Sequence, residues 1–482
     1  MKLFDVILFI CLIFLTTLYW SEWIIYPLIL TLFVVSLIAY SRRMKGNAFH
    51  PLAYVIYIFF TLLVIPLFIV PLTVYDQSLL QEIPKVSMLI GLATISVYIG
   101  YYMRAGRNIA TFIPLVGFPH VRLQRAIIQR IVILYLIGWI GRAALMVVGY
   151  SHISSQITKL LSYLSLLKDL SNFSILCFTM LIYYIFTSIS KRQMSRSVGY
   201  TYIVGLSILE ITYGVMYGGR SAIIMPFLMI LFSYSFSVKR IRWSVIVTLF
   251  LSAMLIAGPI ITAYRVSFFD ALLDTSNVSR SAVVMAALDK TKIQNINWVE
   301  ASMEVFQHRT GTVETTMRMM NRVPSKHDYE MGNTFIPELS TAFIPRIFWP
   351  EKPIYNNGRY YSYLFWDDSV HYSETGTSTG IGIFGELYFN FGWLGLIFMP
   401  FFGLVIRIIM ERIKLYSSTE IVYGNIARYY YLIFVVSSGL TATIAGFIVT
   451  GIRAWIIYLI FLTLLHMKLP KIFQFRATRT EK

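Results

Sequence analysis

The chain has 482 residues, of which 57% are hydrophobic, 16% aromatic and only 13% charged, and its formal net charge is +18. A mean hydropathy of +0.68 excludes an ordinary soluble globular protein and indicates a polytopic membrane protein. The basic residues lie in short clusters between apolar runs, so the positive-inside rule explains them and nucleic-acid binding is not expected.

Apolar stretches long enough to cross a bilayer follow one another along the chain, and they predict an all-α fold with about 12 transmembrane helices. They lie near 3–20, 22–41, 51–75, 86–103, 129–150, 172–190, 198–217, 221–238, 244–265, 382–410, 425–446 and 449–466. The first stretch lacks a small-residue cleavage site and is expected to be a retained helix. Cys11 and Cys177 both lie in apolar runs, so neither a disulfide framework nor a thiolate metal site is expected.

The basic connections between these stretches alternate onto one side, which predicts that both termini are cytoplasmic. They are RRMK at 42–45, the Arg-rich 104–130, KRQMSR at 191–196, KRIR at 239–242, ERIK at 411–414 and the C-terminal tail. The predicted organisation places nine transmembrane helices in 1–265. Three further helices and a basic cytoplasmic tail occupy 381–482.

Between the ninth and tenth helices lies a long segment, 266–380, on the opposite, extracytoplasmic side. It holds more than half of the chain's 23 acidic residues. Loops of this length are usually functional, so the segment is expected to be a folded cap. Within it, the apolar spacing of 297–320 predicts a helix, whereas 332–380 has little periodicity and is expected to be an extended, packed loop.

Four arginines lie in or at the ends of apolar stretches, in the half of the membrane where the positive-inside rule expects few. They are Arg142, Arg220, Arg265 and Arg453. The planar guanidinium suits phosphate oxygens, which favours a pocket for an anionic lipid head group. The alternative is that some arginines reach the outer interface or pair with buried acids, such as Glu210 or Glu386.

Glu304 and His308 lie four residues apart on the predicted cap helix and so share a face, with Arg309 next to them. A carboxylate that orients an imidazole makes His308, or Glu304 itself, a candidate general base for a hydroxyl group. An ion pair on a solvated helix explains the same spacing equally well. No metal-ligand pattern and no phosphate-binding glycine loop is found, so neither a metal nor a nucleotide cofactor is expected.

The cap is also rich in aromatic residues, of which Trp349, Tyr360 and Trp366 are the candidates for sugar binding. Aromatic faces stack on the apolar faces of sugar rings, and tyrosine adds a hydroxyl group. An aromatic belt at the membrane interface is the alternative.

Four segments in this order resemble the Wzy-type oligosaccharide repeat unit polymerases, which include O-antigen and exopolysaccharide polymerases. The segments are GGRSAIIMPF (218–227), AYR (263–265), FIPRIFWPEKP (343–353) and GELYFNFGWLG (385–395). The resemblance implies a GT-C-like helical membrane fold. It also implies polymerisation of oligosaccharides carried on undecaprenyl pyrophosphate, at the outer face of the bacterial cytoplasmic (inner) membrane. Arg220 and Arg265 match the arginines of the family's helix-end motifs, and Arg346 lies in its Pro-rich motif.

The resulting hypothesis is an inverting, metal-independent glycosyl transfer. Arg142, Arg220, Arg265 and Arg346 would bind the donor pyrophosphate, and His308 or Glu304 would accept the proton of the acceptor hydroxyl. The expected partners are the lipid-linked oligosaccharide and the bilayer, with a chain-length regulator and a flippase as candidate partner proteins. An O-antigen ligase that uses the same donor and a lipid-linked oligosaccharide flippase are the alternative functions.

Overall fold

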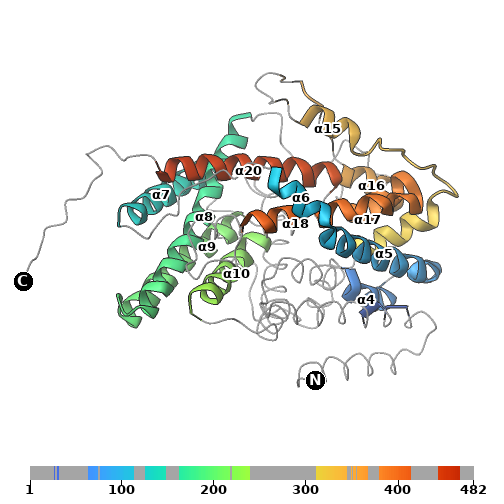
Figure 1. Cartoon of the computed structure of the whole chain (residues 1–482). Helices are drawn as coiled ribbons and strands as arrows, with labels where there is room; N and C mark the ends of the chain where they lie inside the picture. The colour runs from blue at the N-terminus through green and yellow to red at the C-terminus, as the bar shows by residue number, and fades with distance from the viewer. Residues whose placement is uncertain are drawn as a thin grey trace, which may run out of the picture. The chain divides into compact units, whose positions relative to one another are not determined.

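The structure, a computed structural model, describes residues 26–27, 30–31, 63–73, 76–112, 125–147, 162–217, 220–238, 311–342, 344, 349, 351–353, 355, 357–366, 379–413 and 443–466. Every regular element in these ranges is a helix (Figure 1). They are α4 (Ile65–Thr73), η3 (Gln77–Glu82), α5 (Ile83–Tyr102), α6 (Arg104–Phe112), α7 (Arg125–Val147), α8 (Ser162–Ser190), α9 (Arg196–Tyr217), α10 (Arg220–Ser237), α15 (Ile336–Ala342), α16 (Asn357–Trp366), α17 (Gly382–Phe391), η8 (Gly392–Phe398), α18 (Met399–Ile413) and α20 (Ile444–His466). Residues 311–322 form a further helix.

Six stretches of the described residues are long and apolar enough to cross a membrane, which confirms a helical membrane protein. They are Gln77–Tyr102, Ile127–Met146, Leu170–Ser190, Arg196–Tyr217, Gly382–Ile409 and Ile444–Leu465, and Ala222–Ser235 forms a shorter apolar helix. These stretches match seven of the predicted spans. The predicted spans at 3–20 and 244–265, nearly all of 22–41 and 425–446, and the first part of 51–75 lie outside the described residues.

The chain forms two compact units. The first contains the described residues within 1–115, 240–414 and 432–451, and the second those within 116–239, 415–431 and 452–482. α17 begins at Gly382, and residue 265 lies outside the described ranges. The division of the chain into 1–265, a cap at 266–380 and 381–482 stays a prediction.

The second unit is centred on α8, whose residues from Phe173 to Phe186 are mostly buried. α7 approaches it closely at Gly138, where an added Cβ would lie 2.5 Å from the Ser174 nitrogen. On α10, the Ser233 hydroxyl donates to the Thr179 carbonyl of α8 at 3.2 Å. Small residues and interhelical hydroxyl bonds are the usual means by which helices associate in membranes.

The first unit contains an equally close approach, between α5 and α18. A Cβ added at Gly100 would lie 1.9 Å from the Pro400 oxygen, and one added at Gly403 would lie 1.9 Å from the Val97 oxygen. Because backbone atoms cannot move aside as a side chain can, both positions require glycine at the present helix separation.

Gly403→Ala is therefore expected to force α5 and α18 apart and to destabilise the first unit by about 1–3 kcal/mol, the usual cost of overpacking. The measurement is the thermal midpoint of unfolding in detergent. Gly205→Ala on α9 is the matched control, because no atom lies within 4 Å of its added Cβ. That control should be neutral or stabilising, since alanine is the better helix former. Equal midpoints for the two variants would contradict the packing described.

The predicted span at 382–410 is not one helix but three pieces, α17, η8 and α18. Gly392 ends α17 with φ +60°, a conformation that favours glycine. A Cβ added at Gly395 would lie 2.3 Å from the Leu387 oxygen, although these residues would be about 12 Å apart along a straight helix. The chain therefore bends back at this point, which hydropathy alone does not reveal.

Two secondary-structure predictions for the 266–380 segment can be compared with the structure. The predicted helix is confirmed where it is described, and the predicted extended loop is wrong in part. Residues 311–322 are helical, as predicted for 297–320, whose first part lies outside the described residues. The prediction of an extended loop over 332–380 is wrong in part, because α15 and α16 lie within it. α16 is supported by burial of Tyr361 and Phe365 against Phe389 of α17, a contact between segments distant in sequence.

Candidate functional site

A buried carboxylate, Glu386 of α17, connects three segments of the first unit. Its side chain is fully buried. Oε1 accepts hydrogen bonds from the Thr334 hydroxyl and the Tyr361 hydroxyl, each at 3.0 Å. Oε2 accepts from the backbone N–H of Ile444, the first residue of α20. The carboxylate is thus satisfied by donors and favoured by the positive end of the α20 dipole.

Asn390, one turn further along α17, continues this network. Its Nδ2 donates to the Thr334 hydroxyl and to the Glu386 carbonyl, both at 2.7 Å. Its Oδ1 accepts from the backbone N–H of Gly332 at 2.7 Å. The backbone N–H groups of Glu330 and Met331 donate to the carbonyls of Phe389 and Asn390, each at 3.1 Å. Residues 330–334 are therefore fixed to the end of α17 by both backbone and side-chain bonds.

An aromatic layer lies beside this network and fixes α16. The ring centroids of Tyr361 and Phe365 lie 6.0 and 5.4 Å from that of Phe389. Burial raises the pKa of Tyr361 well above its ordinary value, so its hydroxyl remains a hydrogen-bond donor at any physiological pH. We call residues 311–366 of the described chain the outer segment, after the side of the membrane predicted for it, and Glu386 and Asn390 are its polar anchors.

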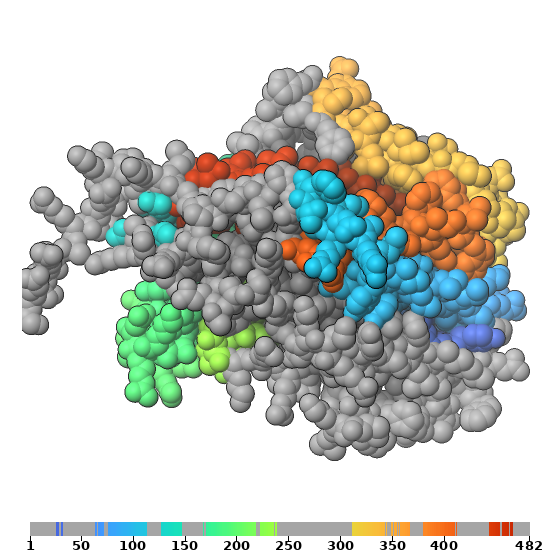
Figure 2. Space-filling model, in the orientation of Figure 1, coloured from blue at the N-terminus to red at the C-terminus, as the bar shows by residue number. Residues whose placement is uncertain are grey.

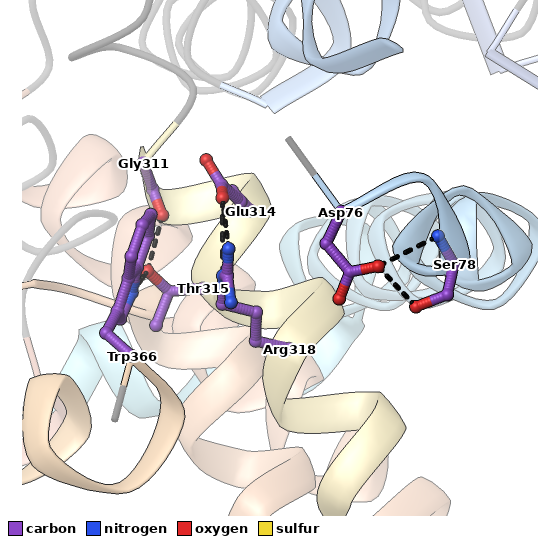
Figure 3. Close-up of polar contacts among 7 residues, drawn as sticks. All are labelled: Asp76, Ser78, Gly311, Glu314, Thr315, Arg318 and Trp366. Carbon is purple, nitrogen blue, oxygen red and sulfur yellow. Dashed lines mark hydrogen bonds and ion pairs between the residues drawn. The ribbon is translucent and has the colours of Figure 1, made fainter. Parts of the chain in front are cut away.

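At the end of α16 a second group of side chains lies partly open to solvent (Figure 3). The Trp366 Nε1 donates to the Thr315 hydroxyl at 2.9 Å. The Arg318 guanidinium carbon lies 4.3 Å from the centroid of the Trp366 ring. Arg318 also donates to Glu314 Oε1 from Nη2 at 2.9 Å, and the side chains of Arg318 and Glu314 are 18% and 13% exposed. We call Glu314, Thr315, Arg318 and Trp366 the Trp366 cluster.

A further carboxylate, Asp76, is influenced by the charge of Arg318. Asp76 is the N-cap of η3, and its Oδ1 accepts from the Ser78 hydroxyl at 2.6 Å and the Ser78 N–H at 3.0 Å (Figure 3). These bonds, and to a smaller extent the charge of Arg318, lower the pKa of Asp76 below its ordinary value of 3.8. Asp76 therefore remains an anion, and a hydrogen-bond acceptor, at neutral pH.

The Trp366 cluster combines types of group that can bind a carbohydrate. The Arg318 guanidinium covers one face of the indole ring, so a sugar could stack only on the other face. Carboxylates and a guanidinium can exchange hydrogen bonds with hydroxyl groups. Sequence reasoning selected Trp366 but missed its partners. The spacing of Glu314 and Arg318, four residues apart on a predicted helix, was the available signal.

The other two predicted sugar-binding residues have different surroundings. The Tyr360 hydroxyl donates to Glu330 Oε1 at 2.5 Å, next to the polar anchors rather than the Trp366 cluster. Trp349 is half-buried in the Pro-rich segment, and its carbonyl accepts from the Lys352 N–H at 3.1 Å. The Lys352 ammonium donates to the carbonyls of Ala342 and Ile344, both at 3.2 Å, and so closes this segment onto the end of α15.

Arg142 lies in the second unit, where it forms a buried ion pair. Its Nη1 is 2.8 Å from Glu210 Oε1, and the two side chains are 6% and 1% exposed. The Tyr213 ring lies under the guanidinium with its centroid at 4.1 Å, and the Tyr135 hydroxyl donates to Glu210 at 3.0 Å. This is the arrangement that the ion-pair interpretation expects, and the role of Arg142 as a pyrophosphate ligand stays a prediction.

The remaining predicted residues have no described side chain. Arg220 is the first residue of α10, as its helix-end motif predicts, but its side chain lies outside the description. Arg265, Glu304, His308 and Arg346 lie outside the described residues.

Comparison with known proteins yields one match. A family model described as a domain of unknown function (DUF8712) matches residues 129–467, which is more than half of the chain. This range includes the Arg142–Glu210 pair, the outer segment and both polar anchors, whereas Asp76 precedes it. No curated protein and no solved structure matches the chain.

Proposed function

The chain belongs to the DUF8712 family, and we propose that it is a membrane glycosyltransferase that polymerises oligosaccharide units carried on undecaprenyl pyrophosphate. The activity would take place at the outer face of the bacterial cytoplasmic membrane. The proposal rests on the resemblance of four sequence segments to Wzy-type polymerases and on the chemistry of the outer segment.

The observation that carries the proposal is the attachment of the outer segment to α17. GELYFNFGWLG supplies both polar anchors, and FIPRIFWPEKP lies in the segment that they hold. Glu386 bonds Thr334 before the Pro-rich segment and Tyr361 after it. A residue of GELYFNFGWLG thus holds the chain both before and after the Pro-rich motif, which supports a preorganised substrate site over a loose connection.

In the proposed reaction, a hydroxyl oxygen of the acceptor sugar attacks the anomeric carbon of the donor. The bond from that carbon to the pyrophosphate oxygen breaks, and undecaprenyl pyrophosphate leaves with the electron pair. His308 or Glu304 takes the hydroxyl proton, and Arg220, Arg265 and Arg346 stabilise the charge of the leaving group. The Trp366 cluster binds a sugar ring of the growing chain, with the indole as the stacking surface.

Replacement of Trp366 tests this assignment. Trp366→Ala is expected to raise the acceptor concentration needed for half-maximal extension by about threefold to tenfold. This change corresponds to the free energy that one aromatic contact contributes. Trp366→Phe, which keeps a stacking face but loses the bond to Thr315, should have a smaller effect. Tyr363→Ala, an exposed aromatic residue of the same helix, is the matched control. Extension that is equally affected in Trp366→Ala and Tyr363→Ala would contradict the assignment.

Product analysis tests the function itself. The purified protein in liposomes, supplied with undecaprenyl-pyrophosphate-linked oligosaccharide, is expected to yield a ladder of chain lengths. Loss of the ladder in Arg220→Ala, Arg265→Ala, Arg346→Ala or His308→Ala, at unchanged protein level, would assign those side chains to the reaction. A single transfer to a different lipid acceptor would identify a ligase instead. Movement of the donor between leaflets without extension would identify a flippase and overturn the proposal.

A further inference from the structure

The short helix α6 follows the membrane span of α5 directly and has an unusual charge environment. α5 ends at Tyr102, and α6 begins at Arg104 after a single residue. The sequence contains no acidic residue from Ile83 to Lys168. α6 therefore lies at the end of a membrane-spanning helix, in a stretch of chain with exclusively positive side-chain charge.

The residues of α6 form three faces with different surroundings. The first face packs on α18, where Gly106 and Ala110 are buried and a Cβ added at Gly106 would lie 2.9 Å from the Arg407 side chain. The second face is polar and exposed, and it consists of Arg104, Arg107, Asn108 and Thr111. The third is apolar and also exposed, with Ile109 at 39% and Phe112 at 85%. In Figure 2 the light-blue atoms of this part of the chain lie on the visible surface.

The arginines of the polar face differ from Arg407, their neighbour on α18. Arg407 forms an ion pair with Glu411 and lies 5.3 Å from the centroid of the Tyr101 ring, so its charge has a partner in the protein. Within the described residues, neither Arg104 nor Arg107 takes part in an ion pair. Two exposed cations and an exposed phenylalanine on one short helix are the pattern of a helix that lies in the membrane interface.

From this arrangement we propose that α6 is an interfacial helix whose arginines bind the head groups of anionic phospholipids. Phe112 and Ile109 enter the acyl boundary, while Arg104 and Arg107 contact head-group phosphates at the membrane surface where α5 ends. The basic connections predict that this surface is cytoplasmic. The inference depends on the charge and position of α6 alone, so it stands or falls independently of the proposed glycosyl transfer.

Lipid binding by the full-length protein tests the inference. The purified protein is equilibrated with equal amounts of phosphatidylglycerol and phosphatidylcholine, and retained lipids are counted by native mass spectrometry. A basic residue at an anionic membrane surface contributes about fivefold in binding, so Arg104→Gln/Arg107→Gln is expected to lower the preference for phosphatidylglycerol by about 25-fold. High salt should also lower the preference of the natural protein for phosphatidylglycerol.

Two further variants make the result specific. Arg104→Lys/Arg107→Lys keeps both charges and should retain most of the preference. Lys191→Gln/Arg196→Gln removes the exposed charges of Lys191, just after α8, and of Arg196, the first residue of α9, from another predicted cytoplasmic connection. No helix lies between α8 and α9, so its loss of preference should be clearly smaller. An unchanged preference in Arg104→Gln/Arg107→Gln would overturn the inference and leave these arginines with a role in membrane orientation only. An equal loss in the Lys191→Gln/Arg196→Gln protein would overturn it as well, because net charge would then be the cause.

Discussion

Arg142→Ala is expected to lower the free energy of unfolding by about 3–5 kcal/mol, the usual result of breaking a buried ion pair by removing one partner. Glu210 would lose the guanidinium while its side chain is 1% exposed, and among the described residues the Tyr135 hydroxyl would be its remaining side-chain donor. The Tyr213 ring would also lose the cation above it. The measurement is unfolding of the purified protein by SDS in detergent micelles, followed by circular dichroism.

Two comparisons separate this effect from a general loss of charge. Arg196→Ala removes an exposed arginine at the start of α9 and is expected to change stability by no more than about 0.5 kcal/mol. Arg142→Met combined with Glu210→Met removes both charges and keeps the volume, so much of the lost stability should return. If the double variant is no more stable than Arg142→Ala, the unpaired carboxylate is not the cause of the loss.

Glu386→Ala is expected to release the outer segment from α17. The Thr334 hydroxyl, the Tyr361 hydroxyl and the Ile444 N–H would all lose their acceptor, and each buried unsatisfied group costs about 1–3 kcal/mol. A total of at least about 3 kcal/mol corresponds to amide exchange about two orders of magnitude faster in the segment that opens. The reporters are the amides of residues 330–332, which bond directly to the end of α17.

Hydrogen–deuterium exchange measures this opening, with the amides of α8 as the internal control. Glu386→Gln keeps a carbonyl for two donors but turns an NH₂ group toward the Ile444 N–H, so an intermediate increase is expected. Tyr361→Phe removes one donor and should accelerate exchange by about one order of magnitude or less. Faster exchange throughout α8 as well would show that Glu386→Ala unfolds the protein, and unchanged exchange at 330–332 would contradict the anchoring role.

The membrane spans could be predicted from sequence because their signal is local. The predicted helix at 198–217 and the observed α9, Arg196–Tyr217, differ by two residues, since the basic cluster before it marks its start. The helical part of the cap was found for the same reason, from apolar spacing within one segment. The length and the apolar character of a run of residues can be read directly from the sequence, and these two properties define a membrane-spanning helix.

The features that sequence reasoning missed depend on contacts between distant segments. α16 is stabilised by Phe389, which lies more than twenty residues from Tyr361, so periodicity within the segment gives little sign of it. The break at Gly392 depends on a backbone angle that hydropathy does not measure. Arg142 had two possible partners by charge, and only the three-dimensional structure brings it to Glu210. Trp366 was identified as an aromatic candidate, but its stacking on Arg318 required the fold.

The glycine at 392 has a consequence for how genetic variation in GELYFNFGWLG should be understood. A side chain there would adopt a disfavoured backbone angle and would also lie 2.9 Å from the Tyr329 ring. Glu386, Asn390 and Gly395 of the same motif are likewise explained by burial, hydrogen bonding or lack of space. In a saturation library, intolerance across this motif would thus indicate a requirement for folding. If the proposed sugar site is correct, variants of the Trp366 cluster would instead change what the folded protein binds.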